Sequence, residues 1–132
     1  MNLSFDADGT PIRIELRFAW LENKEGQSFD YWLARGSERS PQGSGLYVWN
    51  PAKRQYTLLE TMSNGTLIEG TVSVSGNELE FLYTATKLDG TTDKLRNLYK
   101  KVSADVLSCV VSRLNGRGAW ETLAEEQFDR KP

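Results

Sequence analysis

Apolar and polar residues alternate through residues 45–86, and each alternating segment ends at a turn. Asn64-Gly65 separates two of the segments. This dipeptide between alternating runs indicates a β-hairpin, because a type I′ turn needs two residues that tolerate positive φ. The sequence therefore predicts an antiparallel meander in the middle of the chain, with strands over residues 46–49, 55–62, 66–75 and 78–86.

The same alternation is strong before the meander, in residues 12–20. Side chains alternate between the two faces of a strand, so the apolar residues of this segment share one face. A second strand is predicted for residues 27–35. Residues 36–45 have no periodicity and are rich in glycine and serine, so we predict a long surface loop there.

After the meander, strands are predicted for residues 92–102 and 106–112. Asn115-Gly116 is a further hairpin signal. It indicates that residues 119–130 form a final strand that pairs with the strand before it. The Glu, Leu and Ala content of that tail favours helix, so a C-terminal helix is the alternative. Residues 1–11 are interpreted as a short strand or a loose N-terminal arm.

Hairpin-linked strands at a spacing of roughly ten residues are typical of sandwiches and barrels rather than of βαβ units. Sequential links favour an up-and-down sheet that closes on itself and thereby removes its exposed edges. The sequence therefore predicts one all-β domain over residues 1–132, an antiparallel meander closing into a barrel with little helix.

The composition excludes several kinds of chemistry. The chain has no histidine and one cysteine, Cys109, which excludes Ser-His-Asp and Cys-His catalysis, His-liganded zinc and haem held by a proximal His. We therefore expect no cofactor and no metal. The net charge of −2 argues against nucleic acid or membrane as a partner. The unpaired cysteine and the lack of a signal-peptide pattern favour the cytoplasm.

The run Gly-Leu-Tyr-Val-Trp-Asn-Pro, residues 45–51, resembles a turn found in calycin-like, lipocalin-like β-barrel proteins of bacteria. Further similarities extend the resemblance over residues 17–130, although the chain lacks the Gly-x-Trp strand with which such families open. They lie at Gly65, Glu69-Gly70-Thr71-Val72, Gly90, Arg96, Tyr99, Trp120 and Arg130. The resemblance implies a lipocalin-like barrel with a cavity for a hydrophobic small molecule, and it implies no reaction.

Aromatic and charged residues inside the predicted strands are the candidates for ligand binding. Aromatic rings would line the cavity, Tyr83 and Tyr99 would donate hydrogen bonds, and Arg96 would anchor a carboxylate. Alternatively, these aromatic residues are ordinary core. The predicted ligand-binding residues are Trp20, Tyr31, Tyr47, Trp49, Tyr56, Glu60, Glu69, Phe81, Tyr83, Arg96, Tyr99 and Trp120.

Glu60 and Glu69 lie within apolar runs. A carboxylate that points into a barrel is desolvated, which raises its pKa and suits it to act as a general acid or base. The alternatives are a solvent-facing residue or a structural ion pair with an arginine. A pair of catalytic carboxylates across one hairpin is a weaker hypothesis.

Three functions follow from these observations. The first is non-catalytic binding of a small apolar or amphipathic molecule. The second is a cofactor-free isomerase, cyclase or hydrolase that uses an interior carboxylate and a tyrosine. The third is a structural or interaction protein with a filled barrel. Several strands are apolar on both faces, which is typical of a second layer or of a homodimer.

Overall fold

The computed structural model describes residues 4–5 and 10–130, and every regular element within them is a β-strand. The strands are β1 (Ser4–Phe5), β2 (Pro11–Trp20), β3 (Gly26–Arg35), β4 (Glu38–Asn50), β5 (Gln55–Met62), β6 (Leu67–Ser75), β7 (Glu78–Thr86), β8 (Thr92–Lys101), β9 (Val106–Leu114) and β10 (Trp120–Asp129). The predicted all-β fold is confirmed. No helix in this part of the chain has the length and apolarity to cross a membrane.

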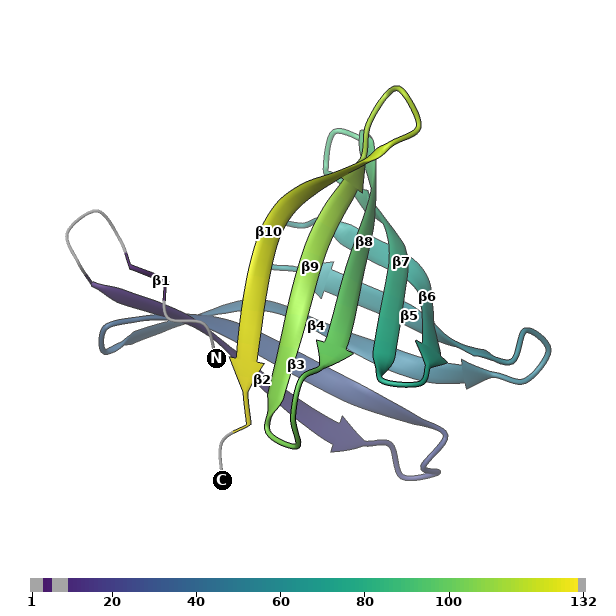
Figure 1. Ribbon diagram of the computed structural model, residues 1–132, viewed down its shortest axis with the longest axis horizontal. Helices are drawn as coiled ribbons and strands as arrows, with labels where there is room; N and C mark the ends of the chain where they lie inside the picture. Colours follow the sequence, from purple (N-terminus) through teal and green to yellow (C-terminus); the bar gives the residue numbers. More distant parts are fainter. Residues whose placement is uncertain (1–3, 6–9, 131–132) are drawn as a thin grey trace.

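The strands form one antiparallel sheet in which spatial order follows chain order from β1 to β10. Figure 1 shows the sheet curling into a half-barrel, with β2, β3 and β4 sweeping under the steeper strands β7 to β10. Among the described residues no pairing joins β10 to β1 or β2. The up-and-down meander is therefore confirmed, while the sheet is an open half-barrel rather than a closed barrel.

Both ends of the chain bear on the sequence predictions. The C-terminal tail pairs with β9 as β10, so the predicted final strand is confirmed and the helix alternative is wrong. Pairing outweighs helix propensity here because alternate residues of the tail face the concave side. Of the predicted N-terminal arm, Ser4 and Phe5 pair with Ile12 and Pro11. Its residues 1–3 and 6–9 lie outside the described part of the chain.

The hairpin between β5 and β6 forms where the sequence predicts it, with a different turn. Gly65 has φ of 82°, whereas Asn64 does not have positive φ. The Gly65 N–H donates to the Met62 carbonyl at 2.9 Å and the Met62 N–H donates to the Thr66 carbonyl at 2.9 Å. This is a type I turn followed by a left-handed glycine. The predicted type I′ turn is wrong because the Asn64 side chain instead accepts a hydrogen bond from the Thr66 N–H at 3.0 Å.

The long loop predicted over residues 36–45 is wrong, because β4 begins at Glu38 and only a short turn separates it from β3. The glycines that suggested a loop are needed for packing inside the strand. A Cβ atom at Gly45 would collide with the Phe29 ring, and one at Gly43 would collide with the Tyr31 ring. Glycine in a strand commonly marks such a close approach.

The core lies on the concave face of the half-barrel. Its four buried side chains come from β3, β5 and β6, and partly buried residues of β4 and β7 pack around them. Cys109 on β9 is also fully buried, so burial extends across the sheet from β3 to β9. The buried side chains are Phe29, Leu58, Ile68 and Val72.

Candidate functional site

A row of aromatic rings crosses the concave face from one edge of the sheet to the other. Neighbouring ring centroids along the row lie between 4.6 and 6.3 Å apart. The rings come from six different strands, whose register brings them to a similar level of the sheet. We call these residues the aromatic row: Phe18, Phe29, Tyr47, Phe81, Tyr99 and Phe128.

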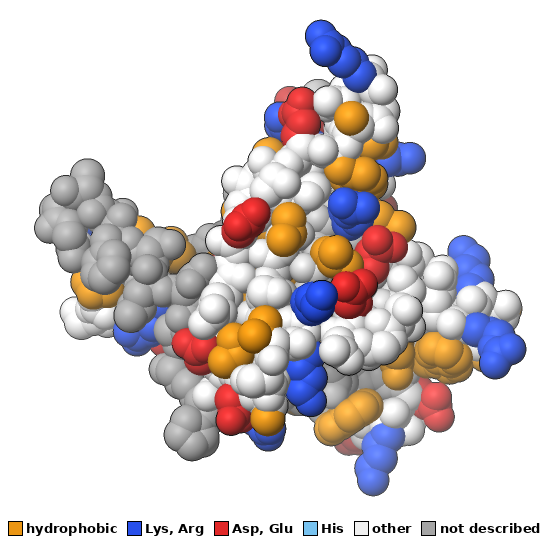
Figure 2. All heavy atoms as spheres, viewed as in Figure 1, with side chains coloured by type: hydrophobic (Ala, Val, Ile, Leu, Met, Phe, Trp, Pro, Cys, Tyr) orange, Lys and Arg blue, Asp and Glu red, His pale blue; other side chains and the backbone are white. Residues whose placement is uncertain are grey.

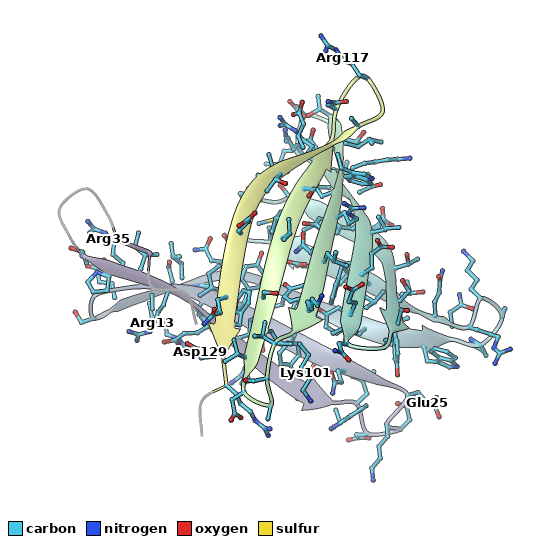
Figure 3. All side chains as sticks on the ribbon, in the orientation of Figure 1. Arg13, Glu25, Arg35, Lys101, Arg117 and Asp129 are labelled. Atoms are coloured by element: carbon cyan, nitrogen blue, oxygen red, sulfur yellow. The ribbon has the colours of Figure 1, made fainter. Side chains whose placement is uncertain are left out.

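A cavity of about 1010 Å³ lies against the aromatic row, on the side of the turn between β8 and β9. Both edges of the sheet line it, because its walls include residues of β2 and of β10. Apolar residues from β6 and β7 complete its floor. Figure 3 shows Lys101 and Asp129, which belong to the lining, at the end of the sheet opposite Arg117. The cavity is therefore apolar and aromatic inside, with charges of both signs at its mouth.

Polar groups gather on the other side of the aromatic row, around Glu60. Burial raises the pKa of Glu60, and the nearby Tyr31 hydroxyl offsets part of this effect by stabilising the carboxylate. Burial raises the pKa values of Tyr47 and Tyr83, and the nearby Glu60 carboxylate raises them further. No cation contributes to the pKa of Glu60. This half-buried carboxyl group therefore has no basic partner among the described residues.

A second buried carboxyl group, Glu126 on β10, lies beside Cys109. Burial raises the pKa of Glu126 and raises the pKa of the Cys109 thiol to about 11. The nearby Tyr99 hydroxyl lowers the pKa of Cys109 by less than burial raises it. At neutral pH the thiol is protonated, so Cys109 is a buried small side chain rather than an activated nucleophile.

The hydroxyl of Tyr83 donates to the Asn97 side-chain carbonyl at 2.9 Å. The pKa of Tyr83 is raised to about 12, chiefly by burial and then by Glu60, Cys109 and Glu126. Tyr83 therefore lies within electrostatic reach of both carboxyl groups. The polar side of the concave face holds neutral tyrosines, and it could donate or accept hydrogen bonds near the two acids.

The predicted ligand-binding residues fall into separate groups. Five of them line the cavity: Trp20, Tyr47, Tyr56, Phe81 and Tyr99. Three others lie on the polar side of the aromatic row: Tyr31, Glu60 and Tyr83. Trp49 packs edge-on against Tyr56, with centroids 5.1 Å apart, at a smaller hollow of about 290 Å³.

The remaining three lie on the convex face. Glu69 is exposed there, opposite Leu59 in the register, whereas Glu60 faces the concave side. The two carboxylates therefore lie on opposite faces of the sheet and do not form the catalytic pair that the sequence suggested. Arg96 stacks over the Trp120 ring at 4.8 Å from its centroid, and its buried Nε atom has no hydrogen-bond partner.

Trp32, which the alternation places opposite the core, is held on the convex face by two arginines. The guanidinium carbon of Arg39 lies 3.8 Å from the ring centroid and that of Arg17 lies 5.2 Å from it. Glu15 accepts from Arg13 at 2.9 Å and from Arg39 at 2.8 Å, which lowers its pKa. This cluster connects β2, β3 and β4. Two of its members, Glu15 and Arg39, also belong to the lining of the cavity.

Sequence reasoning missed four residues of the concave face. Phe18 and Phe128 belong to the aromatic row, Asn97 binds Tyr83, and Glu126 is the second buried acid. The alternation in residues 12–20 and the Leu95-Asn97-Tyr99 pattern placed Phe18 and Asn97 on apolar faces. The same rule applied to β10 would have found Phe128 and Glu126 once that segment was accepted as a strand.

The fold and the cavity define an open, up-and-down β half-barrel. No family model, no curated protein and no solved structure matches this chain. The likeness to calycin-like barrels therefore rests on the sequence motifs, together with a curled sheet that is compatible with them. Within the described residues, no group of three or more Cys, Asp or Glu side chains is arranged to hold a metal ion.

Proposed function

We propose that this protein binds a small, partly apolar molecule in the cavity on its concave face, without chemical conversion. The observation that carries this proposal is the cavity itself. Its volume of about 1010 Å³ lies at the upper end of the range of ligand sites, which is roughly 300–1,000 Å³. Apolar walls with a few polar groups are the usual composition of such sites.

The chemistry of the walls indicates an apolar body for the ligand. Tyr47 and Tyr99 line the cavity, but their hydroxyls interact with Glu60 and Cys109, neither of which belongs to the lining. These two residues therefore present ring carbons, rather than hydroxyl groups, to the cavity. Aromatic surface binds flat apolar groups by burial and stacking. A polar end of the ligand would lie at the mouth, near Lys101.

A fluorescent uncharged probe tests this proposal. N-phenyl-1-naphthylamine becomes fluorescent on entering an apolar site, and we expect the parent protein to bind it. Phe18 is 52% exposed and lines the cavity, so Phe18→Glu places a charge in the wall with little loss of packing. We expect binding at least about tenfold weaker, or roughly 1.4 kcal/mol.

Ala19→Glu is the matched control, since it adds the same charge at the next residue, on the convex face. It should leave probe binding unchanged. Failure of the parent protein to bind the probe, or equal effects of the two variants, would contradict binding on the concave face.

Acid–base chemistry at Glu60 is the second candidate, favoured by its raised pKa and by the nearby Tyr31 hydroxyl. Native mass spectrometry of freshly purified parent and Glu60→Gln separates it from simple binding. A binder retains the same molecule in both proteins. An enzyme would retain product in the parent and substrate in the variant. The two molecules differ in mass for a hydrolase, and for an isomerase or cyclase they differ in chromatographic retention after extraction from the protein.

The expected homodimer and the expected location in the cell are also proposals. Leu46, Val48 and Leu59 are 37%, 39% and 45% exposed on the convex face, and this apolar surface supports a homodimer, whose mass the same native spectra report. The space-filling view shows one face, on which hydrophobic side chains form separate patches interrupted by charged ones (Figure 2). The unpaired thiol of Cys109 supports the cytoplasm as the location.

A further inference from the structure

The half-barrel has two strand edges that border the same opening. On one side the sheet ends at β10, and on the other β1 covers β2 only at Pro11 and Ile12. No other pairing of these edges occurs among the described residues. We call residues 16–20 of β2 and 125–129 of β10 the seam. Residues from both sides of the seam line the cavity, so both edges border it, and among the described residues no strand pairing closes its wall between them.

The topology means that one added strand can run antiparallel to both edges. From β2 to β10 every neighbouring pair is antiparallel, and eight successive reversals leave β2 and β10 running in the same direction. A strand antiparallel to β10 is therefore antiparallel to β2 as well. Antiparallel addition to an exposed edge is a common way to bind an extended peptide.

The edge of β10 presents backbone groups for such a strand. The Arg130 N–H donates to the Asp105 carbonyl at 2.8 Å. Because hydrogen-bonded pairs alternate along an antiparallel ladder, Phe128 and Glu126 also bond to β9. The N–H and C=O of Gln127 consequently point away from β9, toward the seam.

The side chains at the seam specify the chemistry of the strand. Leu16, Phe18 and Trp20 on the concave face of β2 are 42%, 52% and 65% exposed, so apolar residues would pack against them. Glu126 faces the same side from β10, and it has no ion pair in the described chain. Burying this carboxylate under an apolar strand would be unfavourable.

A charge that points inward on an edge strand discourages association with apolar strands and with further copies of the chain. A strand that carries lysine or arginine at the matching position satisfies that charge instead. We propose that the seam accepts an extended segment of another protein, with apolar residues facing the cavity and one basic residue against Glu126. This peptide strand would complete the open wall of the cavity.

Fluorescence anisotropy with short labelled peptides tests the proposal. The probe is Val-Thr-Val-Thr-Lys-Thr-Val, in which valine and lysine share one face, and its partner has glutamate in place of lysine. We expect the lysine peptide to bind the parent at least about tenfold more tightly. Glu126→Gln should remove this preference, and Glu126→Lys should reverse it.

Two further variants make the test specific. Glu125→Gln removes the same charge from the neighbouring residue, on the convex face, and it should preserve the preference for lysine. Gln127→Pro removes the N–H that points toward the seam, so it should abolish peptide binding while circular dichroism shows an intact sheet.

Several outcomes would overturn the proposal. The first is equal binding of the two peptides, and the second is an equal effect of Glu125→Gln and Glu126→Gln on the preference for lysine. The third is peptide binding by Gln127→Pro that equals binding by the parent. The fourth is self-association of the parent that excludes the peptide, because a second copy of the chain would then occupy the seam. Binding of N-phenyl-1-naphthylamine is measured separately. Failure of the peptide test is therefore distinct from failure of the small-molecule proposal.

Discussion

At the scale of single residues, Glu60 makes the clearest prediction about pH. Burial raises its pKa above the ordinary value of 4.5, so the folded state favours the protonated form. The corresponding stability is present below the unfolded-state pKa and is lost as the pH rises through the folded-state pKa. Glu60→Gln removes this dependence. Between acidic and neutral pH, the parent should lose unfolding free energy relative to the variant.

Urea unfolding of both proteins at a series of pH values measures this difference. Glu69→Gln is the control, because Glu69 is exposed on the convex face. Its unfolding curves should follow those of the parent at each pH. If Glu60→Gln also follows the parent, Glu60 titrates as a solvated carboxylate and the acid–base candidate loses its support.

At the scale of elements, the packing of β3 against β4 depends on Gly45, because glycine has no side chain. Gly45→Ala would drive a methyl group into the Phe29 ring and the Leu59 carbonyl. We expect a loss of about 1–3 kcal/mol in unfolding free energy. A change in near-UV circular dichroism should accompany it, because Phe29 stacks on Tyr47 with centroids 4.6 Å apart.

Gly116→Ala serves as the comparison, since a Cβ atom there meets nothing within 4 Å. Its unfolding free energy should stay within about 0.5 kcal/mol of the parent. A comparable loss in both variants would show that backbone flexibility, rather than the Phe29 contact, is what glycine provides at position 45.

The strands with local alternation were predictable because their signal lies within a few residues. β2 is an example, since its apolar residues repeat at every second position. The start of β4 was not predictable, because Gly43 and Gly45 read as loop residues until the rings of β3 are placed over them. The aromatic row was not predictable either. It extends from Phe18 on β2 to Phe128 on β10, so it depends on the register of every strand between them.

At the scale of the whole molecule, the open half-barrel divides the sheet into a protected middle and two edges. β5 and β6 have partners on both sides, whereas β10 pairs only with β9 in the described chain. The main core cluster lies on β3, β5 and β6, and Cys109 and Ser112 are also buried on β9, beside the edge strand. Local stability should therefore fall from the centre of the sheet toward the seam.

Amide hydrogen exchange tests this division one residue at a time. On β10 the Gln127 amide points toward the seam and the Phe128 amide bonds to β9, so Gln127 should exchange at least about tenfold faster. On β6, the neighbouring amides of Thr71 and Val72 should both be protected, because that strand is paired on both sides. Equal protection of Gln127 and Phe128 in the isolated protein would mean that another strand already covers β10. The half-barrel would then be closed in solution, and its cavity would open to solvent only at the end that carries Lys101.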